Sequence, residues 1–207
     1  MFKEEAYWIK SVLLKIPLSD GNIANLGSST KHFRTIIQPH INQNIIVPLE
    51  ERGLKITNID IKKEEGVDIQ ADLTSKYFSK QVGGKYDLIL CTNMLEHVES
   101  ISNVIDNLVQ IVNKDGYILI TVPRKYPIHL DPIDNKFRPK PKEISDLFNK
   151  KTKYTIIESK IIQIKDIDSY PIKKSSMVLW RYRKRFRFWL KKYYSVSGIL
   201  LQINKFY

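Results

Sequence analysis

Residues 85–123 read KYDLILCTNMLEHVESISNVIDNLVQIVNKDGYILITVP and contain two apolar runs separated by a helical pattern. The first run, residues 86–91, has the length of a buried strand, and the second, residues 117–122, follows an Asp-Gly turn and is rich in β-branched side chains. Between them, residues 98–112 place apolar side chains at the spacing of one helix face. Strand, helix and strand in this order predict a βαβ unit of a parallel sheet.

Four residues that can carry binding or catalysis follow the first of these strands, namely Asn93, Met94, Glu96 and His97. Ligands of parallel sheets bind beyond the carboxyl ends of the strands. We therefore expect these four residues to lie in a binding site.

Length and composition indicate one cytoplasmic domain. The 207 residues, 43% of them hydrophobic, are enough for a single core. The sequence contains no run of about 18 apolar residues, which a membrane-spanning helix would need. The first twenty residues carry acids where a signal peptide needs a basic region. The single cysteine, Cys91, can form neither an internal disulfide nor a cysteine-rich metal site.

The formal net charge of +12 is concentrated near the C-terminus. Residues 173–207 contain ten Lys and Arg and no acid, which leaves a net charge of +2 for residues 1–172. Within residues 173–194 the apolar and basic side chains fall on opposite sides of a helical wheel. This pattern is typical of a helix at an anionic membrane surface. Packing of the apolar side on the sheet and contact with nucleic acid are the alternatives.

We accordingly divide the chain into an α/β domain, residues 1–172, and a C-terminal part of the same domain, residues 173–207. The C-terminal part holds the basic amphipathic helix and a last strand at residues 197–206. We expect that strand to pair antiparallel with residues 154–164.

Three further strands end at a glycine or an acid. They are predicted at residues 22–26, 54–59 and 67–73, with helices at residues 3–15 and 48–52. The residues at the strand ends are Gly27, Asp60 and Asp72. Each aspartate taken alone could equally be a helix cap or a turn former.

The order and spacing of these strand ends, together with the LEHV tetrad at residues 95–98, resemble the class I S-adenosylmethionine-dependent methyltransferases, of the type 11-like group. The resemblance covers about residues 22–154. It implies a Rossmann-like, doubly wound, mostly parallel sheet with an antiparallel last strand, in three α/β/α layers. It also implies S-adenosyl-L-methionine as the cofactor and methyl transfer as the reaction.

The resemblance further implies a role for each strand end. Gly27 would approach the methionine part of the cofactor, Asp60 would accept hydrogen bonds from the ribose hydroxyls, and Asp72 would flank the adenine. The full set of cofactor-binding residues implied in this way is Gly27, Ser28, Ser29, Asp60, Ile61, Asp72, Leu73, Asn93 and Met94.

The glycine loop departs from the family pattern. The family usually has three glycines here, whereas this chain keeps Gly27 and has serines at positions 28 and 29. Serine restricts backbone angles that glycine accepts freely, so cofactor binding could be weak or lost. The absence of a GxGxxG fingerprint argues against a nicotinamide enzyme.

A proline-rich loop, residues 123–139, follows the fifth strand and is too long for a mere connection. It contains His129 and Asp131. A hydroxyl acceptor benefits from a general base, and the candidates are His129 or His97, oriented by Asp131 or Glu96. In the alternative interpretation these side chains only cap turns or pack. A metal site at this loop is weakly supported, and we predict none.

The string HLDPIDNKFRP, residues 129–139, resembles small methyltransferases found with bacterial surface-polysaccharide enzymes. We therefore expect methyl transfer to a small or lipid-linked acceptor, such as a sugar hydroxyl, at the inner membrane face. An RNA methyltransferase and a non-catalytic binding module with this fold are the two rival interpretations. The near-neutral residues 1–172 argue against the RNA interpretation, because a basic stripe beside the pocket would be expected.

Overall fold

The computed structural model of the chain describes residues 1–128, 133–165 and 194–206. The predicted catalytic residues His129 and Asp131 lie outside the described residues. The same holds for the predicted amphipathic helix, except for Tyr194 at its end.

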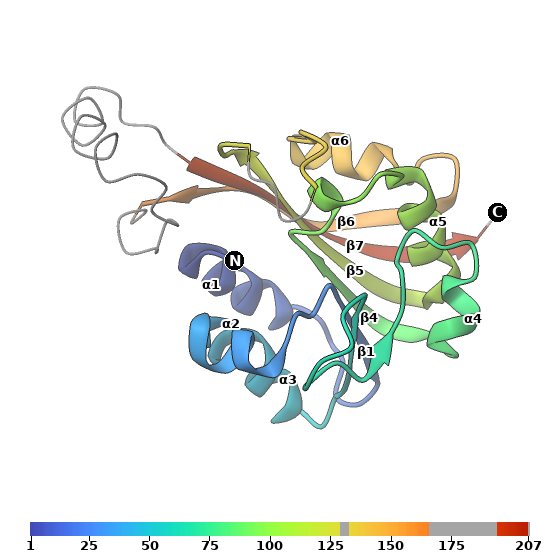
Figure 1. Cartoon of the computed structure of the whole chain (residues 1–207). Helices are drawn as coiled ribbons and strands as arrows, with labels where there is room; N and C mark the ends of the chain where they lie inside the picture. The colour runs from blue at the N-terminus through green and yellow to red at the C-terminus, as the bar shows by residue number, and fades with distance from the viewer. Residues whose placement is uncertain (129–132, 166–193, 207) are drawn as a thin grey trace.

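Seven strands form one sheet in the order β3-β2-β1-β4-β5-β7-β6 (Figure 1). Strands β1 to β5 pair in parallel, and β7 pairs antiparallel with both β5 and β6. The bounds are β1 Asn22–Leu26, β2 Lys55–Asp60, β3 Ile69–Gln70, β4 Tyr86–Thr92, β5 Val112–Lys125, β6 Thr152–Ile164 and β7 Tyr194–Phe206. The predicted fold class is confirmed, and so is the antiparallel last strand beside the predicted residues 154–164.

Helices cover both faces of the sheet. One face carries α1 (Lys3–Leu13), α2 (Pro39–Ile41) and α3 (Val47–Glu50), and the other carries α4 (Phe78–Val82), α5 (Ile101–Ile111) and α6 (Pro141–Asp146) (Figure 1). Two π-helical turns, η1 (Phe33–Ile37) and η2 (Asn42–Ile46), extend the first group. Among the described residues, no helix is long and apolar enough to cross a bilayer.

The alternation of side chains along the strands creates two hydrophobic cores. In β4, Leu88 and Leu90 pack toward α1 and α3, whereas Ile89 and Cys91 pack toward α4 and α5. Because both faces are covered, the central strands are apolar at nearly every position, as parallel strands usually are. This arrangement leaves the strand ends as the places where polar side chains can gather.

Helix α1 approaches β7 very closely. A Cβ atom added at Gly198 would lie 2.4 Å from the indole ring of Trp8. Only glycine allows this contact, so the last strand and the N-terminal helix are fitted to each other.

Several predicted boundaries were wrong, and the last strand, for example, begins at Tyr194 and not at residue 197. The third strand is only Ile69–Gln70, because just two residues pair with β2. Helix α5 begins at Ile101, where the Ser100 hydroxyl accepts a hydrogen bond from a main-chain N–H of the first turn. The LEH part of the LEHV tetrad therefore forms a separate 3-10 turn, η3 (Leu95–His97), between β4 and α5. Strand β5 extends in both directions beyond the predicted residues 117–122.

Candidate active site

The loop after β1 is held by backbone hydrogen bonds to the end of β2. The amides of Gly27 and Ser28 both donate to the carbonyl of Ile59, at 2.8 and 3.2 Å. Gly27 and Ser29 have φ values of +64° and +56°. Serine therefore adopts, at position 29, a left-handed backbone that favours glycine. The serines of this loop therefore do not force its backbone into an extended form.

Asp60 is tied to the same loop. One carboxylate oxygen accepts a hydrogen bond from the amide of Ser29 at 2.7 Å, and the other accepts one from the amide of Lys62 at 3.1 Å. A carboxylate offers about four acceptor positions, so these two bonds orient it and leave capacity for a diol. The carboxylate thus points at the loop from the end of β2, which is where the sequence prediction needs it.

Met94 lies directly on Gly27. A Cβ atom at Gly27 would lie 2.0 Å from Met94 Sδ and 2.5 Å from its Cγ. The ends of β1 and β4 therefore meet, as the topology of a doubly wound sheet predicts. Methionine is flexible and polarisable, so it can change rotamer to admit a ligand at this glycine.

The other predicted cofactor residues lie near the sheet edge beyond β2. Leu73 is buried and Ile61 is 64% exposed. Asp72 Oδ1 accepts hydrogen bonds from the amide and the hydroxyl of Thr74, both at 2.8 Å, and so forms a turn. The described structure gives Asp72 this local role, and its predicted contact with adenine remains a prediction.

Asn93 is held by a buried glutamate from the N-terminal helix. Glu5 is fully buried, and its Oε1 accepts hydrogen bonds from Asn93 Nδ2 at 2.8 Å and Thr121 Oγ1 at 2.6 Å. A carboxylate only accepts, so the amide nitrogen of Asn93 must face Glu5. Asn93 has a φ of +52°, which its hydrogen bond to Glu5 helps to stabilise.

Glu96 is the most unusual side chain of the site. It is 1% exposed, and neither of its carboxylate oxygens has a hydrogen-bond partner among the described residues. The pKa of Glu96 is raised to about 8, mainly by burial and also by the nearby charge of Glu5. A buried carboxyl group that is protonated near neutral pH, beside a strand end, is typical of functional sites.

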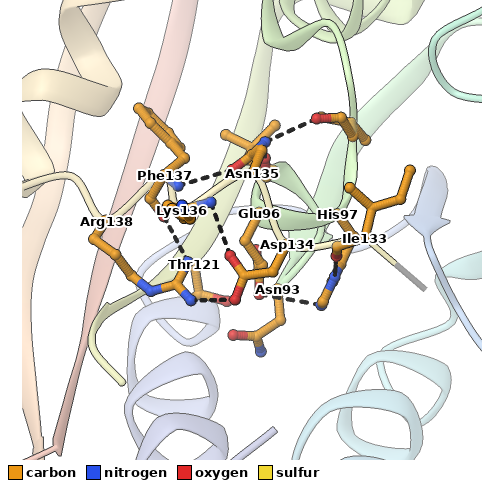
Figure 2. Close-up of polar contacts among 12 residues, drawn as sticks. Asn93, Glu96, His97, Thr121, Ile133, Asp134, Asn135, Lys136, Phe137 and Arg138 are labelled. Carbon is orange, nitrogen blue, oxygen red and sulfur yellow. Dashed lines mark hydrogen bonds and ion pairs between the residues drawn. The ribbon is translucent and has the colours of Figure 1, made fainter. Parts of the chain in front are cut away.

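His97 lies next to this carboxyl group and is oriented by the loop before α6 (Figure 2). Its Nδ1 is 2.6 Å from the carbonyl oxygen of Ile133, and its Nε2 is 3.7 Å from Glu96 Oε1. Because a carbonyl can only accept, Nδ1 carries the hydrogen and Nε2 faces the carboxyl group. Nε2 is therefore the ring nitrogen without a hydrogen, and at 3.7 Å it lies beside Glu96 but beyond hydrogen-bond distance.

Residues 133–138 lie across Glu96 and His97 and are locked in place (Figure 2). Asn135 donates from its amide side chain to the carbonyls of Leu95 at 2.7 Å and Val98 at 2.8 Å. Asp134 forms a buried ion pair with Arg138 at 2.6 Å. This segment of the proline-rich loop therefore fixes the turn η3, and Asp134 is committed to Arg138.

The described residues contain no group of three or more His, Cys, Asp or Glu side chains that could hold a metal ion. The structure brings together Gly27, Ser28, Ser29, Asp60, Asn93, Met94, Glu96 and His97. Two residues that support this set, Glu5 and Arg34, were not predicted from the sequence; Arg34 donates hydrogen bonds to the carbonyls of Ser28 and Ser29. Glu5 lies on the apolar side of α1, and an acid on an apolar stripe was the available signal.

A family model described as a methyltransferase domain matches residues 13–185. The chain belongs to this family. The membership and the fold confirm the resemblance drawn from the sequence, and they agree with the predicted class of S-adenosylmethionine-dependent methyltransferase.

Among curated proteins, the ubiquinone biosynthesis O-methyltransferase of Aeromonas salmonicida is similar to this methyltransferase domain. The two are 28% identical over 91 residues, which is 38% of either chain. The chain thus spans only about 38% of the length of the curated relatives it matches.

Two solved structures share the fold. The magnesium protoporphyrin IX methyltransferase of Synechocystis PCC 6803, with bound S-adenosylmethionine, has a TM-score of 0.56 and 12% identity, over 98% of this chain and 79% of that one. An O-methyltransferase from a polyketide synthase of Brevibacillus brevis, in complex with S-adenosylhomocysteine, has a TM-score of 0.57 and 15% identity, over 97% of this chain and 72% of that one. At these identities the likeness concerns the fold.

Proposed function

We propose that this methyltransferase domain transfers a methyl group from S-adenosylmethionine to a hydroxyl of a small or lipid-linked acceptor, such as a sugar of a surface polysaccharide. The observation that carries the proposal is the buried Glu96, without a hydrogen-bond partner among the described residues, beside His97 at the end of β4. The similarity to an O-methyltransferase supports a hydroxyl acceptor.

The chain has the groups that would hold the cofactor. Asp60 would accept hydrogen bonds from the ribose hydroxyls, and charge-assisted bonds of this kind contribute about 1.5–3 kcal/mol each. Gly27 leaves the backbone open to close approach once Met94 has moved aside. Asn93, with its nitrogen committed to Glu5, would present its carbonyl oxygen to a donor of the ligand. The bound cofactor would supply an electrophilic methyl group on a sulfonium.

Glu96 and His97 would act on the acceptor. His97 Nε2, the ring nitrogen without a hydrogen, would accept the proton of the acceptor hydroxyl as that hydroxyl oxygen attacks the methyl group that the bound cofactor would supply, and Glu96 would help to position His97. General bases of this kind contribute about 10²–10⁴-fold. Positioning of the two reactants can account for much of the remaining barrier, up to about 7–11 kcal/mol. Residues 133–138 support both the general base and the positioning of the acceptor, because they fix the turn η3 that carries Glu96 and His97.

The first experiment is calorimetric titration of the protein with S-adenosylmethionine and S-adenosylhomocysteine, beside the variant Asp60→Ala. Asp68→Ala is a matched control, because Asp68 also accepts a backbone hydrogen bond, from Asn58 at 2.7 Å, but lies at the other end of the loop from Asp60, directly before β3. We expect micromolar binding that Asp60→Ala abolishes and Asp68→Ala retains. Absence of binding by the wild type would overturn the enzyme proposal in favour of a non-catalytic module.

The location of the acceptor is a separate proposal. Residues 173–194 have the sequence pattern of an interfacial helix, which supports contact with an anionic membrane on the cytoplasmic side. Sedimentation with anionic vesicles should be lost when these residues are deleted, and unchanged sedimentation would refute the membrane contact. Salt-sensitive binding to RNA would instead favour a nucleic-acid acceptor.

A further inference from the structure

Arg34 joins two loops at the edge of the candidate cofactor site. It lies in η1 and is only 6% exposed. Its Nη1 donates hydrogen bonds to the carbonyls of Ser28 at 2.9 Å and Ser29 at 2.7 Å, and its Nη2 donates to the carbonyl of Gly66 at 2.9 Å. One guanidinium therefore donates hydrogen bonds to carbonyl groups of both loops, the loop after β1 and the loop after β2.

The second loop, residues 61–66, approaches the first without space for a side chain. A Cβ atom at Gly66 would lie 2.7 Å from the backbone nitrogen of Lys31 and 3.0 Å from its Cα. The same Lys31 amide donates to the carbonyl of Glu65 at 2.9 Å. The hydrogen bonds of Arg34 are thus part of a close backbone contact between the two loops. Asp60 lies directly before the second loop.

The direction of the carbonyls matters for the ligand. With the Ser28 and Ser29 carbonyls turned to Arg34, the Ser29 amide is left to point at Asp60, where it donates at 2.7 Å. Ser29 has a left-handed φ of +56°, a backbone conformation that serine disfavours and glycine accepts. A fixed partner for its carbonyl counteracts that preference.

We propose that Arg34 is a positioning residue for the cofactor: it holds the serine-containing loop and Asp60 in the binding geometry. The proposal rests on the proposed function, since it assumes that this loop binds S-adenosylmethionine. A planar guanidinium can reach two loops with separate N–H groups, whereas the ammonium of lysine is a compact point donor. Replacement by lysine should therefore loosen the loop while keeping the positive charge.

Arg52 provides a matched control. It also donates to three carbonyls, those of Leu13 at 2.9 Å, Ile16 at 2.7 Å and Leu18 at 2.5 Å. These carbonyls belong to the segment at the end of α1 and not to the loops after β1 and β2. Arg52→Lys therefore removes the same kind of bond at a place where no cofactor contact is expected.

The test compares Arg34→Lys and Arg52→Lys by thermal unfolding without ligand and by calorimetric titration with S-adenosylhomocysteine, at a temperature where both variants are folded. We expect both to unfold at lower temperature. Only Arg34→Lys should bind more weakly, by about tenfold to hundredfold, as the loss of one or two charged hydrogen bonds predicts. Unchanged affinity of Arg34→Lys, or an equal loss in both variants, would overturn the proposal.

A second variant covers the case in which Arg34→Lys does not fold. Gly66→Ala pushes the same two loops apart, because its Cβ atom would lie 2.7 Å from the backbone nitrogen of Lys31, and it retains the Arg34 side chain. It should weaken S-adenosylhomocysteine binding as well, and wild-type affinity in this variant would contradict the positioning role. If the wild type itself does not bind, the proposed function fails together with this inference, a result distinct from a defect confined to the variants.

Discussion

Replacement of Glu96 by glutamine should change how stability depends on pH. The folded protein holds this carboxyl group protonated up to about pH 8, whereas in the unfolded chain it ionises near 4.5. Between these values unfolding releases a proton, so the free energy of unfolding of the wild type falls as pH rises. Glutamine has nearly the same shape and does not titrate, so the variant lacks this contribution.

The magnitude follows from the two pKa values. Each pH unit between them corresponds to about 1.36 kcal/mol, so the stability of the variant relative to the wild type should rise by about 5 kcal/mol from pH 4.5 to pH 8. Over the convenient range from pH 5.5 to 7.5 the expected change is about 3 kcal/mol. Below pH 4.5 the relative stability should be constant.

Urea titrations of both proteins at several pH values measure this difference, provided that unfolding is reversible and two-state. The contributions of the other titratable groups, which both proteins contain, cancel in the difference between the two free energies of unfolding. The pair is also compared in a His97→Asn background, because His97 Nε2 lies 3.7 Å from Glu96 Oε1. A relative stability that does not vary with pH would refute the reasoning, because the carboxyl group would then titrate near its ordinary value.

Three other substitutions test the framework around the site. Glu5→Ala removes the acceptor for two side-chain donors, and we expect a loss of about 2–5 kcal/mol in urea unfolding; a smaller loss would mean that the donors find other partners. Gly27→Ala should lower stability by about 1–2 kcal/mol through its φ of +64° and weaken S-adenosylhomocysteine binding, and adding Met94→Ala should restore part of the binding. Gly198→Ala introduces a methyl group against the rigid indole of α1, so it should lower the unfolding temperature without changing the affinity; a changed affinity would contradict a purely structural role.

The strands and the site residues beside them were largely predictable because they follow local patterns. β1 and β4 were predicted within one residue, since buried parallel strands are short apolar runs with distinct ends. The positions of Gly27, Asp60 and Asn93 follow from those ends. The short β3 was overestimated because alternation in sequence does not reveal how many residues find a partner.

Other parts of the site depend on contacts between distant segments and have no local signal. Glu5 meets Asn93 across 88 positions of sequence, and Arg34 meets Gly66 across 32. Neither pair has a spacing that periodicity can detect. The π-helical turns of residues 33–46 were also missed, because the extra residue in each turn disrupts the 3.6-residue pattern.

The position of β7 between β5 and β6 has a consequence for synthesis. When a ribosome has released residues up to β6, β5 has an open edge and β6 has no strand beside it, because the strand that joins them is encoded at residues 194–206. The core near Trp8 is incomplete at the same stage, since α1 packs on Gly198. An emerging chain therefore exposes an unpaired strand edge, which is prone to aggregation, until β7 has emerged and paired.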